Sequence, residues 1–348
     1  MTDRLRQEII LCEVRVTGSF RYRDLFQIEP IYPDAPTIEW AIGHYPCLLE
    51  YKYSVPDISE TKLNPALPKL VIDPILDSDH SRKIRKDLLL ILSTLSKWRI
   101  FQYSTNPLNQ QWFVSIPRNT DDHQADRTPL WGTGGYHYKG ASARMIDDFS
   151  PADRTLIRFR DSREYYGTET PRQYVVGETP NEFELPDRIR QFLDSYLSCS
   201  DERKAAFRAS SLLFDQGIQL FHEASSLAFA ACVSSLETLV AFDHRNEQDL
   251  SCPECGQKVF HVRQKFLKFI KQYGDASQEA RKVADKVYER RSKILHAGQL
   301  FLSETTASGI EDSIDWLPDD QSRRDVIRFF RVCMINWLTA NSGTTGAL

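Results

Sequence analysis

The residues that could most readily take part in a chemical reaction are Arg291 and His296, five positions apart in the stretch Arg-Ser-Lys-Ile-Leu-His. Cleavage of RNA by internal attack needs a base for the 2′-hydroxyl proton, an acid for the leaving 5′-oxygen and a cation for the charged phosphorane. Histidine titrates near neutral pH and therefore suits proton transfer. Arginine stays charged and binds phosphate oxygens with its forked guanidinium. The pair therefore has residue types that suit phosphate chemistry on RNA.

The stretch that ends in this pair is basic. Between Lys258 and His296 the sequence has eleven Lys or Arg residues and four Asp or Glu residues, in a chain whose net charge is -4. A local excess of positive charge attracts a phosphate backbone even when the whole chain is weakly acidic. We therefore predict that Arg290, Lys293 and Lys286 bind RNA.

A helix predicted over 276–297, just before Gly298, has to position the pair. Residues five apart in an ideal helix diverge by about 140°, whereas Ser292 and His296, four apart, share a face. Arg291 and His296 converge if the helix ends or bends near His296, where Gly298 permits a C-cap. Alternatively, two copies of the pair meet across a dimer axis.

A second helix, from Leu227 to Phe242, is apolar nearly all round, and its one charged residue is Glu237. Such a helix is predicted to lie buried inside a bundle. A buried carboxylate needs a partner, because otherwise its pKa shifts and it becomes neutral. Glu237 is therefore expected to contact a cation.

Helical periodicity continues through the whole C-terminal half. The helices predicted at 201–222, 258–273 and 322–341 each have one apolar face to bury, and the set of helices implies a compact bundle over residues 186–341. The predicted helices are 186–197, 201–222, 224–243, 258–273, 276–297 and 322–341.

Residues 1–180 are predicted to form a different domain, strand-rich and mixed α/β, and 181–186 a linker. Strands are expected at 9–16, 37–42 and 47–53, with a helix at 81–98 whose N-cap is Asp77, Ser78 or Asp79. Segments 100–104 and 111–116 are predicted to pair as a hairpin. The predicted fold class is therefore α+β, with the all-α bundle second.

Cys252 and Cys255 form a Cys-x-x-Cys turn followed by glycine. Zinc takes four ligands, and His244 and His261 flank the turn closely enough to complete a structural site. Cys199 is a more remote candidate. No thioredoxin-like pattern surrounds the pair, which argues against redox chemistry. The alternative is two free thiols in a loop.

Composition narrows the class of protein. A hydrophobic content of 41% and a charged content of 26% are ordinary for a globular protein, and 348 residues suit two domains. No apolar run approaches the roughly 18 to 20 residues of a membrane span, and the first residues lack a signal-peptide core. A cytoplasmic protein without a membrane partner is expected.

Taken together, Arg291-x4-His296 resembles the Arg-x4–6-His motif of HEPN domains. The helix with Leu236-Glu237-Thr238-Leu239 and the Cys252-Pro253-Glu254-Cys255 insertion resemble the ApeA-like subgroup. The resemblance covers about residues 186–341. It implies a helical bundle that pairs with a second copy to form one composite endoribonuclease site without a catalytic metal.

Carried over, the resemblance implies that Arg291 stabilises the phosphate charge and His296 acts in acid–base catalysis. Ser292 fits the polar position after the arginine, and Glu237 would orient Arg291 or His296. The resemblance also implies anti-phage defence or a toxin role. The N-terminal domain would then regulate cleavage of tRNA or single-stranded RNA in response to a trigger, phage-derived or other.

Other interpretations remain open on the sequence. Arg291 can be a surface cation favoured by the helix C-terminus, and His296 a capping residue. Some HEPN domains only bind RNA or assemble with partners, so the fold does not settle activity. A zinc-dependent hydrolase is disfavoured, because the recognisable ligands are few and structural in character.

Overall fold

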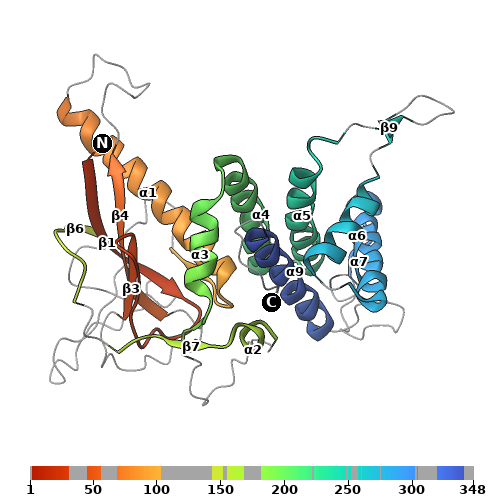
Figure 1. Ribbon diagram of the computed structural model, residues 1–348, viewed down its shortest axis with the longest axis horizontal. Helices are drawn as coiled ribbons and strands as arrows, with labels where there is room; N and C mark the ends of the chain where they lie inside the picture. Colours follow the sequence, from red (N-terminus) through yellow and green to blue (C-terminus); the bar gives the residue numbers. More distant parts are fainter. Residues whose placement is uncertain are drawn as a thin grey trace. The chain divides into compact units, whose positions relative to one another are not determined.

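We describe a computed structural model of the chain (Figure 1), which covers residues 2–30, 45–55, 69–102, 143–151, 155–167, 182–221, 223–247, 250–251, 258–259, 261–274, 276–301, 304 and 320–340. The chain forms two units. One comprises Met1–Arg160 and Arg172–Leu185, and the other comprises Asp161–Pro171 and Pro186–Leu348. An antiparallel sheet lies in the first and a set of helices in the second, which confirms the α+β class.

The sheet of the first unit has the order β2-β3-β4-β1-β5, and β6 also pairs with β1. Its long central strands β1 (Thr2–Cys12) and β4 (Tyr45–Val55) run antiparallel along their whole length. The remaining strands are β2 (Phe20–Tyr22), β3 (Phe26–Pro30), β5 (Ile100–Phe101) and β6 (Ala143–Ile146). A separate two-stranded ladder joins β7 (Arg158–Arg160) to β8 (Glu184–Pro186).

The strand predictions hold in part. The predicted strand 47–53 lies inside β4, whereas the strand predicted at 9–16 begins earlier and ends at Cys12. Ile100 and Phe101, in the first segment of the predicted hairpin, form β5 and pair with β1. The strand predicted at 37–42 and the segment 111–116 lie outside the described residues.

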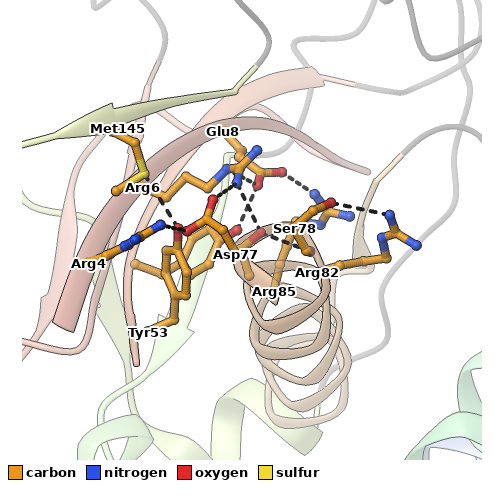
Figure 2. A network of polar contacts seen from close by, with 11 residues as sticks. Arg4, Arg6, Glu8, Tyr53, Asp77, Ser78, Arg82, Arg85 and Met145 are labelled. Carbon is orange, nitrogen blue, oxygen red and sulfur yellow. Dashed lines mark hydrogen bonds and ion pairs between the residues drawn. The ribbon is translucent and has the colours of Figure 1, made fainter. Parts of the chain in front are cut away.

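Helix α1 (Lys69–Leu95) is longer than the helix predicted at 81–98 and contains Pro74 near its start. Asp77, Ser78 and Asp79 therefore lie inside the helix, and none of them is its N-cap. Asp77 instead accepts hydrogen bonds from Arg4 at 2.5 Å and from the Tyr53 hydroxyl at 2.6 Å (Figure 2). The Asp77 carboxylate, which the sequence pattern predicted as an N-cap, thus forms an ion pair between α1 and β1.

A second carboxylate, Glu8 of β1, also connects the sheet to α1 (Figure 2). It is 2% exposed, accepts a hydrogen bond from the Tyr51 hydroxyl at 2.6 Å and is ion-paired with Arg85 of α1. Nε of Arg6 lies 3.0 Å from Oε1 of Glu8, and Nη1 of Arg6 lies 3.5 Å from Oδ2 of Asp77. Because the buried Glu8 and the half-buried Asp77 each have both a cation and a phenol beside them, the network stabilises the docking of α1 on the sheet.

The second unit contains α2 (Ser162–Gly167), α3 (Ile189–Ser198), α4 (Asp201–Leu220), α5 (Ser225–Asp243), α6 (Val262–Tyr273), α7 (Gln278–Ala297) and α9 (Asp320–Thr339). The predicted helices agree with these within a few residues, except that 258–273 begins too early. There Lys258–Val259 forms β10, which pairs with β9 (Leu250–Ser251), and the helix starts at Val262.

Helix α2 corrects the predicted domain boundary, because Asp161–Pro171 belongs to the second unit and not to the N-terminal domain. Tyr165 and Tyr166 are buried, and the Tyr166 ring lies 6.4 Å from that of Phe192 on α3. Arg328 of α9 donates to the carbonyl of Gly167 at 2.8 Å. Two buried rings in a six-residue helix explain why it stays with the bundle.

Helix α5 is the buried helix of the bundle, as its composition predicted. It packs against α4, α6, α7 and α9, with Cys232, Val233, Leu236 and Leu239 fully buried. The prediction that no apolar run approaches the length of a membrane span does not hold for α5, whose 19 residues are long and apolar enough by length and composition. Within the unit its apolar side chains pack against neighbouring helices.

Candidate functional site

Arg291 occupies a position of α7 that faces the bundle. The buried residues of this helix are Ala284, Val287 and Ile294, and Arg291 falls on the same stripe at helical spacing. Its side chain is 19% exposed. An arginine in such a stripe needs a compensating acid, because an unpaired charge there is costly.

Glu237 of α5 supplies that acid. Nη2 of Arg291 donates to Oε2 of Glu237 at 2.7 Å, and the Glu237 side chain is 17% exposed. The pairing follows from the contact of α5 with α7. Of the partners considered for Glu237, the structure therefore brings it to Arg291.

Tyr288 lies near this contact and is not among the residues predicted from the sequence. Burial, followed by the Glu237 charge, raises the pKa of its phenol, while the Arg291 charge lowers it. The only sequence signal is its spacing, one turn before Arg291 on the same face. An aromatic residue at such a position is ordinarily assigned to the core.

His296 lies apart from this cluster. Helix α7 continues through His296 to Ala297, and Gly298 follows with φ 63° and donates its N–H to the Lys293 carbonyl. The C-cap thus forms at Gly298, as the sequence predicted. Because the helix continues past His296, the cap does not redirect the histidine toward Arg291. His296 is exposed, and helical geometry points it about 140° away from Arg291. Within one copy the predicted pair therefore does not converge.

The remaining candidates on α7 have mixed surroundings. Ser292 is half-buried and Lys286 is exposed. Lys293 is exposed and lies 2.8 Å from Glu289. Arg290 donates to the Leu300 carbonyl at 3.0 Å, and its guanidinium lies 4.8 Å from the centre of the Phe301 ring. Arg290 thus anchors the chain that follows α7, which competes with its predicted contact to RNA.

Local carboxylates offset part of the basic stretch. Arg263 of α6 forms two hydrogen bonds with Asp285 of α7, at 2.6 and 2.5 Å, and this contact lowers the pKa of the carboxyl. Lys265 lies 3.3 Å from Glu247. Exposed cations such as Lys268 and Lys282 extend the basic surface over α6 and α7.

The predicted zinc site has only two of its four candidates in view. His244 places Nδ1 2.6 Å from Glu247, a contact that uses one ring nitrogen and lowers the pKa of that carboxyl. His261 is exposed and precedes α6 with φ 45°. Cys252 and Cys255 lie outside the described residues, in which no group of three metal-ligating side chains occurs.

The strands on either side of these cysteines pair with each other. Strands β9 and β10 pair Ser251 with Lys258, which holds the two ends of segment 252–257 together. Paired ends suit the tight turn that a Cys-x-x-Cys ligand pair needs. Two cysteines and two histidines form a set of side chains that zinc binds. Because the cysteines lie outside the described residues, the structural metal stays a prediction.

Comparison with known proteins does not identify the chain: no family, curated protein or solved structure matches it.

Proposed function

We propose that the chain is a metal-independent endoribonuclease of the HEPN type, whose composite site forms when two copies associate. The observation that carries this proposal is the contact of Glu237 with Arg291, because it orients the arginine of the Arg-x4-His sequence from a neighbouring helix. The exposure of His296 on another face of α7 supports a site shared between copies.

In this mechanism the 2′-hydroxyl oxygen attacks the adjacent phosphorus, and its proton passes to a base. Arg291 stabilises the negative charge of the phosphorane through charge-assisted hydrogen bonds. The bond from phosphorus to the 5′-oxygen breaks, and that oxygen receives a proton. His296 is exposed and can serve in these proton transfers. The products are a 2′,3′-cyclic phosphate and a 5′-hydroxyl.

The substrates we propose are tRNA or single-stranded RNA in the cytoplasm, in anti-phage defence or as a toxin. These assignments rest on the HEPN resemblance of Arg291, His296 and the Cys252 insertion. The first unit would regulate cleavage in response to a trigger, phage-derived or other, because an unguarded ribonuclease would poison its own host. Zinc, where bound, would pin the loop between α5 and α6 and take no part in cleavage.

The test uses purified full-length protein with mixed tRNA and single-stranded RNA in the presence of a chelator. Arg291→Ala and His296→Ala are each expected to lower cleavage by about 100-fold or more, since both remove transition-state interactions. Lys268→Ala, which removes an exposed cation from the same basic stretch, is the matched control. It should stay within about threefold of the wild type.

Mixing the two inactive variants tests whether the site is shared. If each site takes Arg291 from one copy and His296 from the other, a mixed dimer regains one intact site of two. Half the dimers are mixed after free exchange, so about one quarter of wild-type cleavage should return. Cleavage equal in all proteins, or products without cyclic phosphate ends, would contradict the proposal.

A second candidate is a non-catalytic RNA-binding or dimeric assembly module. The inward position of Arg291 favours it, because the ion pair with Glu237 stabilises the bundle whether or not RNA is cleaved. Overexpression in cells separates the two. Toxicity abolished by His296→Ala supports the ribonuclease, whereas toxicity that survives the substitution supports the module.

A further inference from the structure

One face of the sheet in the first unit carries a buried row of polar side chains, where apolar residues are usual. In the register of the ladders, Gln7 of β1 and Gln27 of β3 lie on either side of Glu50 of β4. Glu29 lies two residues after Gln27 and therefore on the same face. Glu29 and Glu50 are 0% exposed, and Gln27 is 1% exposed. Burying two carboxylates on one face is costly unless a cation compensates them.

Glu50 has no cationic partner among the described residues. Its Oε1 accepts hydrogen bonds from Nε2 of Gln7 at 2.6 Å and from the Ser150 hydroxyl at 2.5 Å, and its Oε2 accepts one from the Ser150 N–H at 2.9 Å. Glu8, on the opposite face of the same sheet, is instead ion-paired with Arg85. Because the donors to Glu50 are neutral groups, they leave its negative charge without a counter-charge.

The cation on the same face of β2 does not supply that counter-charge. Arg21 pairs with Gln27 in the ladder of β2 and β3. Its Nε donates to the Arg23 carbonyl at 3.2 Å, and its guanidinium lies 4.4 Å from the centre of the Phe149 ring. Neither contact is with an acid, so Arg21 does not neutralise Glu50.

Gln27 adds an unpaired acceptor to this cluster. Its Nε2 donates to Oε1 of Glu29 and, at 3.1 Å, to the Ser150 carbonyl. Its buried Oε1 has no hydrogen-bond partner among the described residues. The last torsion of a glutamine is soft, so the amide can turn over without moving the backbone. The turned amide presents Oε1 to the Glu29 carboxylate and the Ser150 carbonyl, an arrangement of oxygens that is stable only around a cation.

We propose that Glu29, Glu50, Oε1 of Gln27 and the Ser150 carbonyl bind a calcium ion. Carboxylates, amide oxygens and backbone carbonyls are the ligands that calcium takes, in flexible geometry. Oε2 of Glu50 accepts one hydrogen bond and keeps a lone pair for the ion. Magnesium fits less well, because it retains several waters and the three side chains are almost fully buried.

Neutral oxygens are essential to this site. Among the described residues no three His, Cys, Asp or Glu side chains gather at one point, so two carboxylates need an amide and a carbonyl to complete the coordination. The Ser150 carbonyl belongs to the segment that follows β6, and calcium would therefore fasten this segment to β3 and β4. The inference concerns the first unit and does not depend on RNA cleavage.

Calorimetric titration of the full-length protein with calcium chloride tests the site, after treatment with a chelator and dialysis. We expect one calcium ion per chain and binding of magnesium that is weaker by about tenfold or more. Thiolates do not compete, because calcium is a hard cation. Glu50→Gln should weaken calcium binding about 100-fold, since the number of charged ligands sets the affinity. Gln27→Leu, which removes the amide oxygen, should weaken it about tenfold.

Asp79→Asn is the matched control, because Asp79 is an exposed carboxylate of α1 in the same unit. It should leave the calcium affinity within about twofold of the wild type. Equal affinity in Glu50→Gln and Asp79→Asn would place the ion elsewhere and overturn the proposal. A wild type that binds no calcium, or that binds magnesium more tightly, would overturn it as well.

Thermal unfolding gives a second readout that compares each protein with itself. Calcium that binds only the folded state should raise the melting temperature of the wild type and of Asp79→Asn. The rise should be smaller in Gln27→Leu and absent in Glu50→Gln, whatever the stability of each variant in chelator. An equal rise in all four proteins, or none in the wild type, would contradict a calcium site at Glu50.

Discussion

At the scale of single residues, the contact of Glu237 with Arg291 is an ion pair placed where two apolar side chains would ordinarily pack. Such a pair adds little net stability over a hydrophobic pair of similar volume, because both charges lose water. Removing one partner costs more, since the other charge stays partly buried without compensation. Comparing the stability of a single variant with that of the double variant therefore measures what the pair contributes to folding, apart from any role in cleavage.

Glu237→Leu tests that asymmetry. It should lower the free energy of unfolding by about 2 kcal/mol, less than for a fully buried pair because both side chains keep some exposure. The double variant Glu237→Leu with Arg291→Met should recover at least half of the loss. Urea unfolding followed by circular dichroism measures both.

If the single variant is as stable as the wild type, the contact is not maintained in solution. A double variant no better than the single one would mean that Arg291 is stabilised by other groups. Loss of RNA cleavage in the double variant despite recovered stability would assign the pair to function.

At the scale of elements, α4 and α5 approach each other closely at Gly217. A Cβ added at Gly217 would lie 2.5 Å from Sγ of Cys232 and 2.9 Å from the carbonyl oxygen of Ala228. Glycine therefore sets the spacing at which α5, and with it Glu237, rests in the bundle. The same residue weakens the intrinsic helicity of α4.

Gly217→Ala is expected to destabilise the second unit by a net of about 1–2 kcal/mol. Forced separation of the helices outweighs the roughly 1 kcal/mol by which alanine favours a helix interior. Gly167→Ala is the matched control, because nothing lies within 4 Å of its added Cβ. Thermal unfolding compares them, and a Gly217→Ala protein more stable than the wild type would show that α5 is free to shift.

At the scale of the whole molecule, the chain crosses between its two units more than once. Segment Asp161–Pro171 belongs to the second unit, although the residues on both sides of it belong to the first. The side chain of Asp187 accepts a hydrogen bond from the Ser162 N–H at 3.0 Å, which ties this segment to the start of the bundle. A cut at residue 180 therefore removes part of the bundle together with the first unit.

Two truncations follow from this division. Residues 161–348, which keep α2, should unfold at a higher temperature than residues 181–348, which expose the groove left by two buried tyrosines. Equal melting temperatures would mean that α2 contributes nothing. To test regulation, RNA cleavage by residues 161–348 should be compared with cleavage by the full chain. Identical cleavage by the two proteins would contradict a controlling role of the first unit.

Local sequence patterns were sufficient to predict the helices of the second unit and the burial of α5. The apolar periodicity predicted the helices of the bundle, and Gly298 marked the end of α7 correctly. The composition of 227–242 predicted both a buried helix and a carboxylate in need of a partner. These inferences succeed because they depend on residues three or four apart, which the sequence displays directly.

Only the tertiary structure decided which groups meet. It selected Arg291 as the partner of Glu237 and left His296 on another face of α7. It also moved α2 into the second unit and turned Asp77 from a predicted cap into an ion-pair partner of Arg4. Such choices depend on which helix faces pack together, and contacts between distant residues leave no period in the sequence.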